Sequence, residues 1–280
     1  IILLFLTATL AFFVLFFYKK KAHRSELFSC VSGGRLKPTS PRASESDTIS
    51  GIGISQGVVV STAVNLQAVE GVISKDRLGR YQRTAGIRDL EHAIELYRWN
   101  AEISCAFMLP QHIVEVAIRN AVSEAISQVY GAAWPWSAGF VQSLPGKNPS
   151  FDPRGDLVYA RNKFPGQKTA GKVIPEMKFV FWQKMVTKRH EDRLWNQHLI
   201  KLFPGMPAGT SVSDGRLQIA DDLDKIRKLR NRIAHHEPIY HRNLVDDINR
   251  LKRLLSWRCA DTGAWLDGIE QVTALLQRKP

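Results

Sequence analysis

From about residue 86 onward, apolar side chains recur every three or four positions, which is the period of an α-helix with one buried face. The first run is IRDLEHAIELYRWNAEISCAFM, residues 87–108. Its apolar positions are Ile87, Leu90, Ile94, Tyr97, Ile103 and Phe107. No strong alternation of polar and apolar residues competes with this pattern. The sequence therefore predicts an all-α protein.

Proline and glycine mark the expected ends of the helices. Pro110 opens a second helical run that stops at Gly131, in line with the preference for Pro at the start of a helix and Gly just beyond its end. Residues 131–172 are rich in Pro and Gly, and we expect a long surface loop there. Further helices are expected at 174–200, 214–236, 243–258 and 262–277.

The N-terminal residues form a separate unit. Residues 1–18, IILLFLTATLAFFVLFFY, carry no charge and are followed by Lys19, Lys20 and Lys21. A helix of this length spans about 27 Å, close to the hydrocarbon thickness of a bilayer. The lysines would keep its C-terminal end in the cytoplasm. Residues 1–21 are thus a candidate transmembrane anchor with a basic flank, which would hold a cytoplasmic domain at the inner face of the membrane.

Two interpretations of this segment stay open. A cleaved signal peptide fits less well, because no small-residue cleavage site precedes the lysines. Since the chain begins with Ile, residues 1–60 could also lie outside the mature protein. The Ser-, Gly- and Pro-rich residues 22–61 predict a flexible linker, and residues 62–280 are expected to form the helical domain.

Charge and cysteine content narrow the classes of partner and site. Lys and Arg outnumber Asp and Glu by 39 to 26, a net charge of +13, which favours a polyanion such as nucleic acid or an anionic membrane surface. Three widely spaced cysteines offer neither a disulfide framework nor zinc-ligand spacing. We expect Cys105 and Cys259 to be small core residues.

The stretch KLRNRIAHHEPIYHRNL, residues 228–244, combines Arg, Asn and two adjacent histidines at a helix end. The apolar stripe of this helix holds Ile219, Leu223, Ile226 and Ile233. At 100° per residue Arg230 lies beside the stripe, where a cation needs a partner or a function. Asn231 and His235 are four residues apart and share a face nearly opposite the stripe. The simpler alternative is a solvated helix end, where the macrodipole favours cations.

A second polar stripe runs along the helix expected at 110–130. It consists of His112, Glu115, Arg119 and Ser123. A surface ion pair between Glu115 and Arg119 would explain two of these residues without any function, since such i,i+4 pairs are common and weak.

Two other segments are expected to be structural. In FWQKMVTKRHEDRLW, residues 181–195, Trp182 and Trp195 are expected in the core and the cations on a solvated face, although a phosphate path with base stacking is the alternative. Those cations are Lys184, Lys188, Arg189 and Arg193. His190 is expected at the surface or the core edge. The acids of DDLD, residues 221–224, suit the early part of a helix, and no metal site is expected.

The segment LRNRIAHHEPI, residues 229–239, resembles the RNxxAHH motif of the abortive-infection (Abi-like) family in the HEPN superfamily of all-α proteins. Three upstream segments resemble that family in the same order: ELYRWNAEISCAF, HIVEVAIRNAV and FWQKMVTKRHEDRLWNQHL. The resemblance spans roughly residues 75–275. It implies a HEPN-like helical bundle that cleaves RNA without a metal or cofactor, at the interface of a homodimer, in phage defence or as a toxin.

The resemblance also implies roles for particular residues. His235 would move the proton of a ribose 2′-hydroxyl or of the leaving oxygen, since an imidazole titrates near neutrality. Arg230 would stabilise the phosphorane, Asn231 would orient the phosphate or the imidazole, and His236 would replace or assist His235. The family's E-x-x-x-R-N pattern falls on Glu115, Arg119 and Asn120, which become candidate substrate-binding residues. An antitoxin or a regulatory RNA would restrain such an enzyme.

One position departs from the family pattern. Some relatives carry Tyr two residues after the motif histidine, whereas this chain has Glu237 there, and Tyr240 is out of register. A switch by tyrosine modification is therefore not expected. Two other functions remain open. One is a non-catalytic RNA- or nucleotide-binding module of the same fold, and the other is a membrane-tethered interaction protein whose basic face binds anionic lipid.

Overall fold

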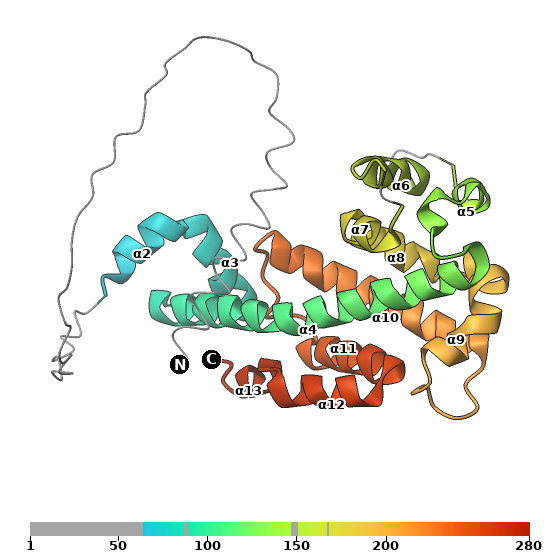
Figure 1. Cartoon of the computed structure of the whole chain (residues 1–280). Helices are drawn as coiled ribbons and strands as arrows, with labels where there is room; N and C mark the ends of the chain where they lie inside the picture. The colour runs from blue at the N-terminus through green and yellow to red at the C-terminus, as the bar shows by residue number, and fades with distance from the viewer. Residues whose placement is uncertain (1–63, 87–88, 147–150, 167) are drawn as a thin grey trace, which may run out of the picture. The chain divides into compact units, whose positions relative to one another are not determined.

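The computed structural model describes residues 64–86, 89–146, 151–166 and 168–280. Throughout these ranges the chain folds into helices and turns and contains no β-strand, so the all-α prediction is confirmed (Figure 1). Residues Thr62–Pro280 form one compact unit. The candidate anchor at 1–18, its lysine flank and the linker expected at 22–61 lie outside the described residues.

The domain is built along α4, Leu90–Tyr130, which packs against α3, α8, α10, α11 and α13 (Figure 1). Asp89 caps its N-terminus by accepting the His92 N–H at 2.9 Å. The helix continues through Pro110, so the expected break at this residue is wrong. Proline removes one backbone hydrogen bond, but Phe107 and Val114 on either side are buried. Tertiary packing of this face holds the helix together.

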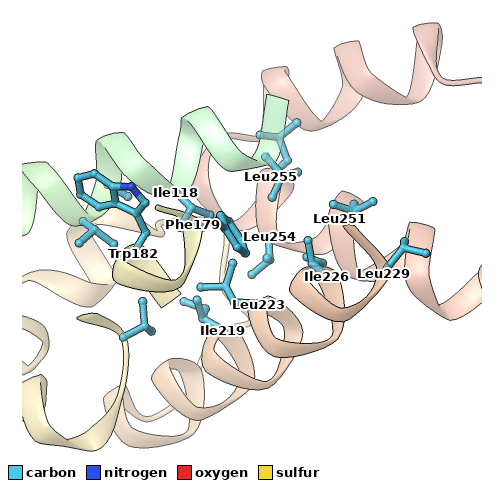
Figure 2. Packing of buried hydrophobic residues seen from close by; sticks show 14 of the residues in the cluster. Ile118, Phe179, Trp182, Ile219, Leu223, Ile226, Leu229, Leu251, Leu254 and Leu255 are labelled. Atoms are coloured by element: carbon cyan, nitrogen blue, oxygen red, sulfur yellow. The ribbon is translucent and has the colours of Figure 1, made fainter. Parts of the chain in front are cut away.

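The core forms where α4 meets α8, α10 and α11. Of these, α8 is Phe179–Met185, α10 is Val212–Ala234 and α11 is Leu244–Arg258. Figure 2 shows Ile118 of α4 and Phe179 of α8 facing the apolar side of α10. All four residues of the expected α10 stripe are buried, together with Leu229. This packing fixes the direction of Arg230 relative to α4.

Two short helices precede α4. Helix α2, Leu66–Ile73, is capped by Asn65, and α3, Lys75–Ala85, is capped by Ser74. Helix α3 buries Leu78 and Tyr81 against the domain. The ring of Tyr81 contacts Tyr97 of α4 and Tyr240 in the loop after α10, with centroid distances of 5.3 and 5.0 Å. These contacts attach α3 beside the end of α10.

Residues 131–172 do not form the expected surface loop. The described part contains the 3₁₀ helix η2 (Trp134–Trp136) and the helices α5 (Ala138–Ser143), α6 (Pro153–Asn162) and α7 (Ala170–Val173). Trp134 and Phe140 are fully buried, and the Trp134 indole donates to Ser123 Oγ at 3.0 Å. Helices this short show no complete amphipathic period, so the sequence pattern missed them.

The single helix expected at 174–200 is instead five pieces. After η3 (Ile174–Glu176) and α8 come the 3₁₀ turn η4 (Lys188–His190), the π-helical η5 (Glu191–Trp195) and α9 (Asn196–Leu202). The Trp195 indole donates to the Met185 carbonyl at 2.8 Å, and Arg216 Nη1 donates to the Val186 carbonyl at 3.1 Å. These side chains satisfy carbonyls that a continuous helix would have paired internally.

The helix expected at 262–277 is also interrupted. Helix α12 is Ala260–Ile269 and α13 is Val272–Leu276. The Glu270 side chain lies at the break and accepts the Thr273 N–H at 3.1 Å. This bond satisfies one of the N–H groups that the first turn of α13 leaves without a helical partner.

Two expectations about single residues are wrong. Cys105 is exposed and Cys259 is half-buried, so neither is a core residue. Cys105 lies on the side of α4 that faces away from Ile103 and Phe107. His190, expected at the surface or core edge, is only 1% exposed.

Among the described residues, α4 is the one helix long and apolar enough to cross a membrane, judged by length and composition. The core helix of a compact domain meets the same two criteria. In this structure α4 is that core helix, and its charged Glu115 and Arg119 side chains are paired with each other.

Candidate functional site

The two histidines lie just beyond the end of α10, not within the helix. Helix α10 ends at Ala234. The Glu237 N–H donates to the Arg232 carbonyl at 2.8 Å, and the His236 N–H donates to the Ile233 carbonyl at 3.0 Å. These two bonds form a Schellman motif. The expected helix end at residue 236 is therefore two residues too late, because this motif closes the helix first.

His236 takes the left-handed position of that motif, with φ +55°. This position is usually glycine, because a Cβ atom is crowded there. Histidine is one of the residues that occupy it more often than most. Both imidazoles are exposed. In the part of the chain that the structure describes, neither imidazole of His235 and His236 forms a hydrogen bond to a protein group.

Three of the predicted site residues converge where α4 faces α10. Glu115 forms an ion pair with Arg119, and Arg230 Nε lies 3.8 Å from Glu115 Oε2. The side chains of Glu115 and Arg119 are 18% and 17% exposed, and that of Arg230 is 29% exposed. The position of Arg230 beside the core stripe agrees with the helical geometry expected from the sequence, and Glu115 is its partner.

This cluster has more positive than negative charge. The single carboxylate of Glu115 pairs with two guanidinium groups, those of Arg119 and Arg230. Burial lowers the pKa of Arg119; Glu115 opposes this effect, and the charge of Arg230 adds to it. The Nε of Arg119 is buried without a hydrogen-bond partner among the described residues. A desolvated donor beside an unbalanced positive charge is suited to an anion such as a phosphate group.

The remaining predicted residues lie around this cluster. Asn231 is half-buried, and its carbonyl accepts the His235 N–H at 3.0 Å. Asn120 is exposed on α4 and does not join the Glu115 cluster through a side-chain contact among the described residues. Ser123 of the polar stripe is buried beneath the Trp134 indole. The structure thus joins Glu115, Arg119 and Arg230, and leaves the histidines and Asn120 at the surface.

Sequence reasoning missed Asn100, which organises the loop after the histidines. This side chain is 6% exposed, and its Oδ1 accepts the N–H groups of Ile239 and Tyr240 at 2.8 and 3.2 Å. The available signal was an amide at a core position of α4, between the apolar Leu96 and Ile103. A buried amide at such a position normally has hydrogen-bond partners.

The tyrosine near the motif has a structural role. Tyr240 is 6% exposed, packs on Tyr81, and its hydroxyl donates to the Arg80 carbonyl at 3.5 Å. Glu237 occupies the position at which the family pattern can have tyrosine. Its side chain is exposed, and its Oε2 lies 3.6 Å from Arg232 Nη2. Tyr240 is thus fixed in the domain and does not extend into solvent.

The segment 181–195 divides largely as predicted, and Arg193 is the exception. Trp182 and Trp195 are fully buried, so their ring faces are not open to bases, and their assignment to the core is confirmed. Lys184, Lys188 and Arg189 are exposed. Arg193 is half-buried and contacts His190 Nδ1.

Two of the acids of residues 221–224, Asp222 and Asp224, bind cations of the protein itself. Asp222 is fully buried and receives two hydrogen bonds from Arg253, at 2.9 and 2.6 Å. Asp224 is bound by Lys228, Arg227 and Gln183, and these contacts, with Lys228 the largest, lower its pKa to about 2. In the described ranges, no group of three or more His, Cys, Asp or Glu side chains is placed to hold a metal ion.

Comparison with known proteins adds no further constraint. No protein-family model matches the sequence, and neither the curated proteins nor the solved structures give a match.

Proposed function

We propose that the protein is an endoribonuclease of the abortive-infection class, which cleaves RNA without a metal ion at an Arg-Asn…His site. The observation that carries this proposal is the convergence of Arg230 with Glu115 and Arg119. These residues come from two motifs far apart in the sequence, and the hypothesis requires them to act together. The partly desolvated positive charge of the cluster supports binding of a phosphodiester group.

The chemistry follows from the ribose 2′-hydroxyl. Its oxygen attacks the adjacent phosphorus while the bond from phosphorus to the 5′-oxygen breaks. His235 takes the 2′ proton, and a second imidazole, from His236 or from His235 of another copy of the chain, gives a proton to the 5′-oxygen. Arg230 stabilises the charge of the phosphorane, and Asn231 orients the phosphate. Glu115 keeps Arg230 and Arg119 in place, and Arg119 and Asn120 bind the neighbouring RNA backbone.

We propose a homodimer because α4 leaves a stripe with large apolar side chains uncovered beside the site. Leu109 and Val116 are each 43% exposed, Cys105 is exposed on the same side of the helix, and the exposed His112 lies between Leu109 and Val116. Glu115 and Arg119 lie at the edge of this stripe. A two-fold contact along α4 would cover the stripe and bring two copies of the cluster close together.

A non-catalytic function is the second candidate, and one observation favours it. A general base is usually oriented by a hydrogen bond to its other ring nitrogen, and neither imidazole has such a partner among the described residues. A module that only binds RNA or a nucleotide would use the same arginines. The proposed dimer offers another explanation for the unpartnered imidazoles, because a second copy of the chain would supply the hydrogen-bond partner. The candidate anchor at 1–18 would place either protein at the cytoplasmic side of a membrane.

The test is RNA cleavage by the full chain in the presence of EDTA. We expect products that end in a 2′,3′-cyclic phosphate, and no cleavage of DNA, which lacks the 2′-hydroxyl. Arg230→Ala should reduce cleavage about a hundredfold or more. Lys228→Ala, an exposed cation on the same helix, is the matched control. Loss of cleavage in EDTA would contradict the metal-independent mechanism, whereas RNA binding without cleavage would favour the second candidate.

A further inference from the structure

The backbone that carries the two histidines is held by side chains from four separate segments. Arg77 of α3 donates to the His236 carbonyl, and Arg232 Nε donates to the Pro238 carbonyl at 3.2 Å. Lys279 near the C-terminus donates to the Tyr240 carbonyl at 3.0 Å. Asn100 of α4 accepts the N–H groups of the two residues that follow Pro238. Alternate carbonyls from residue 236 to residue 240 thus each accept from a cation.

Arg77 acts at the most strained point of this segment. His236 has a positive φ of 55°, a conformation that a residue with a Cβ adopts only at a cost in free energy. Its N–H is already used inside the Schellman motif, and its carbonyl is the group that Arg77 binds. A charged donor on this carbonyl favours the left-handed turn over alternatives that turn the carbonyl away.

Arg77 is itself held in place from two sides. Its backbone N–H donates to Ser74 Oγ at 3.3 Å in the first turn of α3, and its guanidinium lies 5.9 Å from the centre of the Tyr97 ring. The next residue, Leu78, is fully buried. The guanidinium therefore contacts the turn at His236 from a helix that is fixed in the domain. The position of α3 thus determines the position of the backbone that carries the histidines.

We infer that Arg77 is a positioning residue of the proposed nuclease: by binding the His236 carbonyl it fixes the turn that presents His235 and His236, while Asn100 and Lys279 fix the residues that follow. This inference rests on the proposed function for its catalytic consequence. The structural part, that Arg77 holds the turn closed, does not depend on what the protein does.

Hydrogen exchange in the full chain tests the structural part. Exchange of the amides of residues 235–237 reports opening of the Schellman motif. Arg77→Gln should speed their exchange about tenfold or more, the scale expected when a charged hydrogen bond is lost. Arg77→Lys keeps a charged donor and should restore most of the protection. Arg80→Gln makes the same charge change on an exposed side chain of the same helix and should leave the rates unchanged.

Cleavage kinetics test the catalytic part. Arg77→Gln should lower kcat about tenfold with little change in KM, because loosening the turn misplaces the proton-transfer group without removing a phosphate contact. The thermal midpoint should stay near that of Arg80→Gln. Unchanged amide exchange in Arg77→Gln would overturn the inference. So would faster exchange with wild-type kcat. If the wild-type chain cleaves no RNA, the proposed function fails, and the exchange data alone still decide whether Arg77 holds the turn.

Discussion

Two segments of this domain combine arginine with histidine and have opposite arrangements. In residues 230–236 the backbone is fixed by hydrogen bonds, and both imidazoles are exposed. In residues 188–195 the histidine is internal: His190 is 1% exposed and contacts Arg193, and Glu191 beside it forms an ion pair with Arg216 of α10. The same residue types form a candidate reactive surface in one place and part of the core in the other.

The difference shows how burial decides what a histidine can do. Burial is the main cause that lowers the pKa of His190, to about 4, and the charges of Arg193 and Arg189 lower it further. Its imidazole is therefore neutral at neutral pH and accepts a hydrogen bond from Arg193. A group that holds the fold in this way is a poor proton donor at pH 7. The exposed histidines after α10 are free to meet a substrate.

The largest effect should come from the buried ion pair. Arg216→Ala should lower the free energy of unfolding by about 3–5 kcal/mol, because it leaves Glu191 and the Val186 carbonyl without their donor. Lys228→Ala on the same helix removes a cation that is 55% exposed and should cost at most about 1 kcal/mol. Urea denaturation measures both. Equal losses would contradict the assignment of the 188–195 segment to a structural role.

The second prediction concerns acid. The pKa of His190 is lower in the folded protein than in the unfolded chain, so its contribution to stability is complete above pH 6.5 and is lost as the pH falls toward 4. We expect this residue to account for about 3 kcal/mol of destabilisation between pH 7 and pH 4. His190→Asn keeps a hydrogen-bond acceptor but cannot titrate, and should remove that part of the loss.

His92→Gln is the control for this measurement. His92 is exposed, and its hydrogen bond to Asp89 raises its pKa, so its linkage has the opposite sign. The acid-induced loss should therefore persist in this variant. If His190→Asn loses as much stability on acidification as the wild-type chain, then the buried imidazole is not the group that titrates.

The third prediction assigns the roles of the two exposed histidines. His235→Ala should lower RNA cleavage about a hundredfold, equivalent to about 2.7 kcal/mol of activation free energy, with the fold intact. His236→Gly removes the second imidazole and suits the positive φ at that position. It should cost less activity than His235→Ala. Equal losses would indicate a paired acid and base, and the reverse order would show that His236 transfers the proton.

The sequence predicted long amphipathic elements well and short ones poorly. The apolar stripe of α10 and the bounds of α11 could be predicted, because each of these helices buries one face over several turns. The pieces between residues 131 and 172 were not predicted, because helices this short show no complete amphipathic period. The pieces between 174 and 202 were not predicted either, because hydrogen bonds from the side chains of Trp195 and Arg216 pair with carbonyls at the end of α8. The break predicted at Pro110 was also wrong. Packing of α4 against residues distant in sequence outweighs the local preference of proline for the start of a helix.

In the candidate site, too, the sequence predicted some features and not others. Helical geometry placed Arg230 beside the core stripe. The resemblance to the E-x-x-x-R-N pattern selected Glu115 and Arg119, and the structure brings these two residues together with Arg230. Nothing in the spacing of the motif indicates that His236 has a positive φ. The roles of Arg77 and Asn100 depend on contacts across more than a hundred residues, which a local pattern cannot contain.

The smallest effect should come from the surface of α4 that the proposed dimer covers. Val116 is 43% exposed beside Glu115. Val116→Asp would bury a carboxylate at the two-fold contact and face it with its own copy, so we expect the dissociation constant to rise about tenfold or more, equivalent to about 1.4 kcal/mol. Light scattering over a dilution series measures this change.

Val245→Asp is the matched control, because Val245 is an exposed valine on α11 and is 54% exposed. It lies in the first turn of that helix, where an acid suits the helix dipole, so the substitution should alter neither association nor stability. If Val116→Asp weakens association and lowers cleavage together, the exposed histidines act in a site completed by a second chain. A wild-type chain that is monomeric at working dilution and fully active would show that one copy of the residues 230–236 segment is sufficient, and would remove the proposed reason for the exposed stripe on α4.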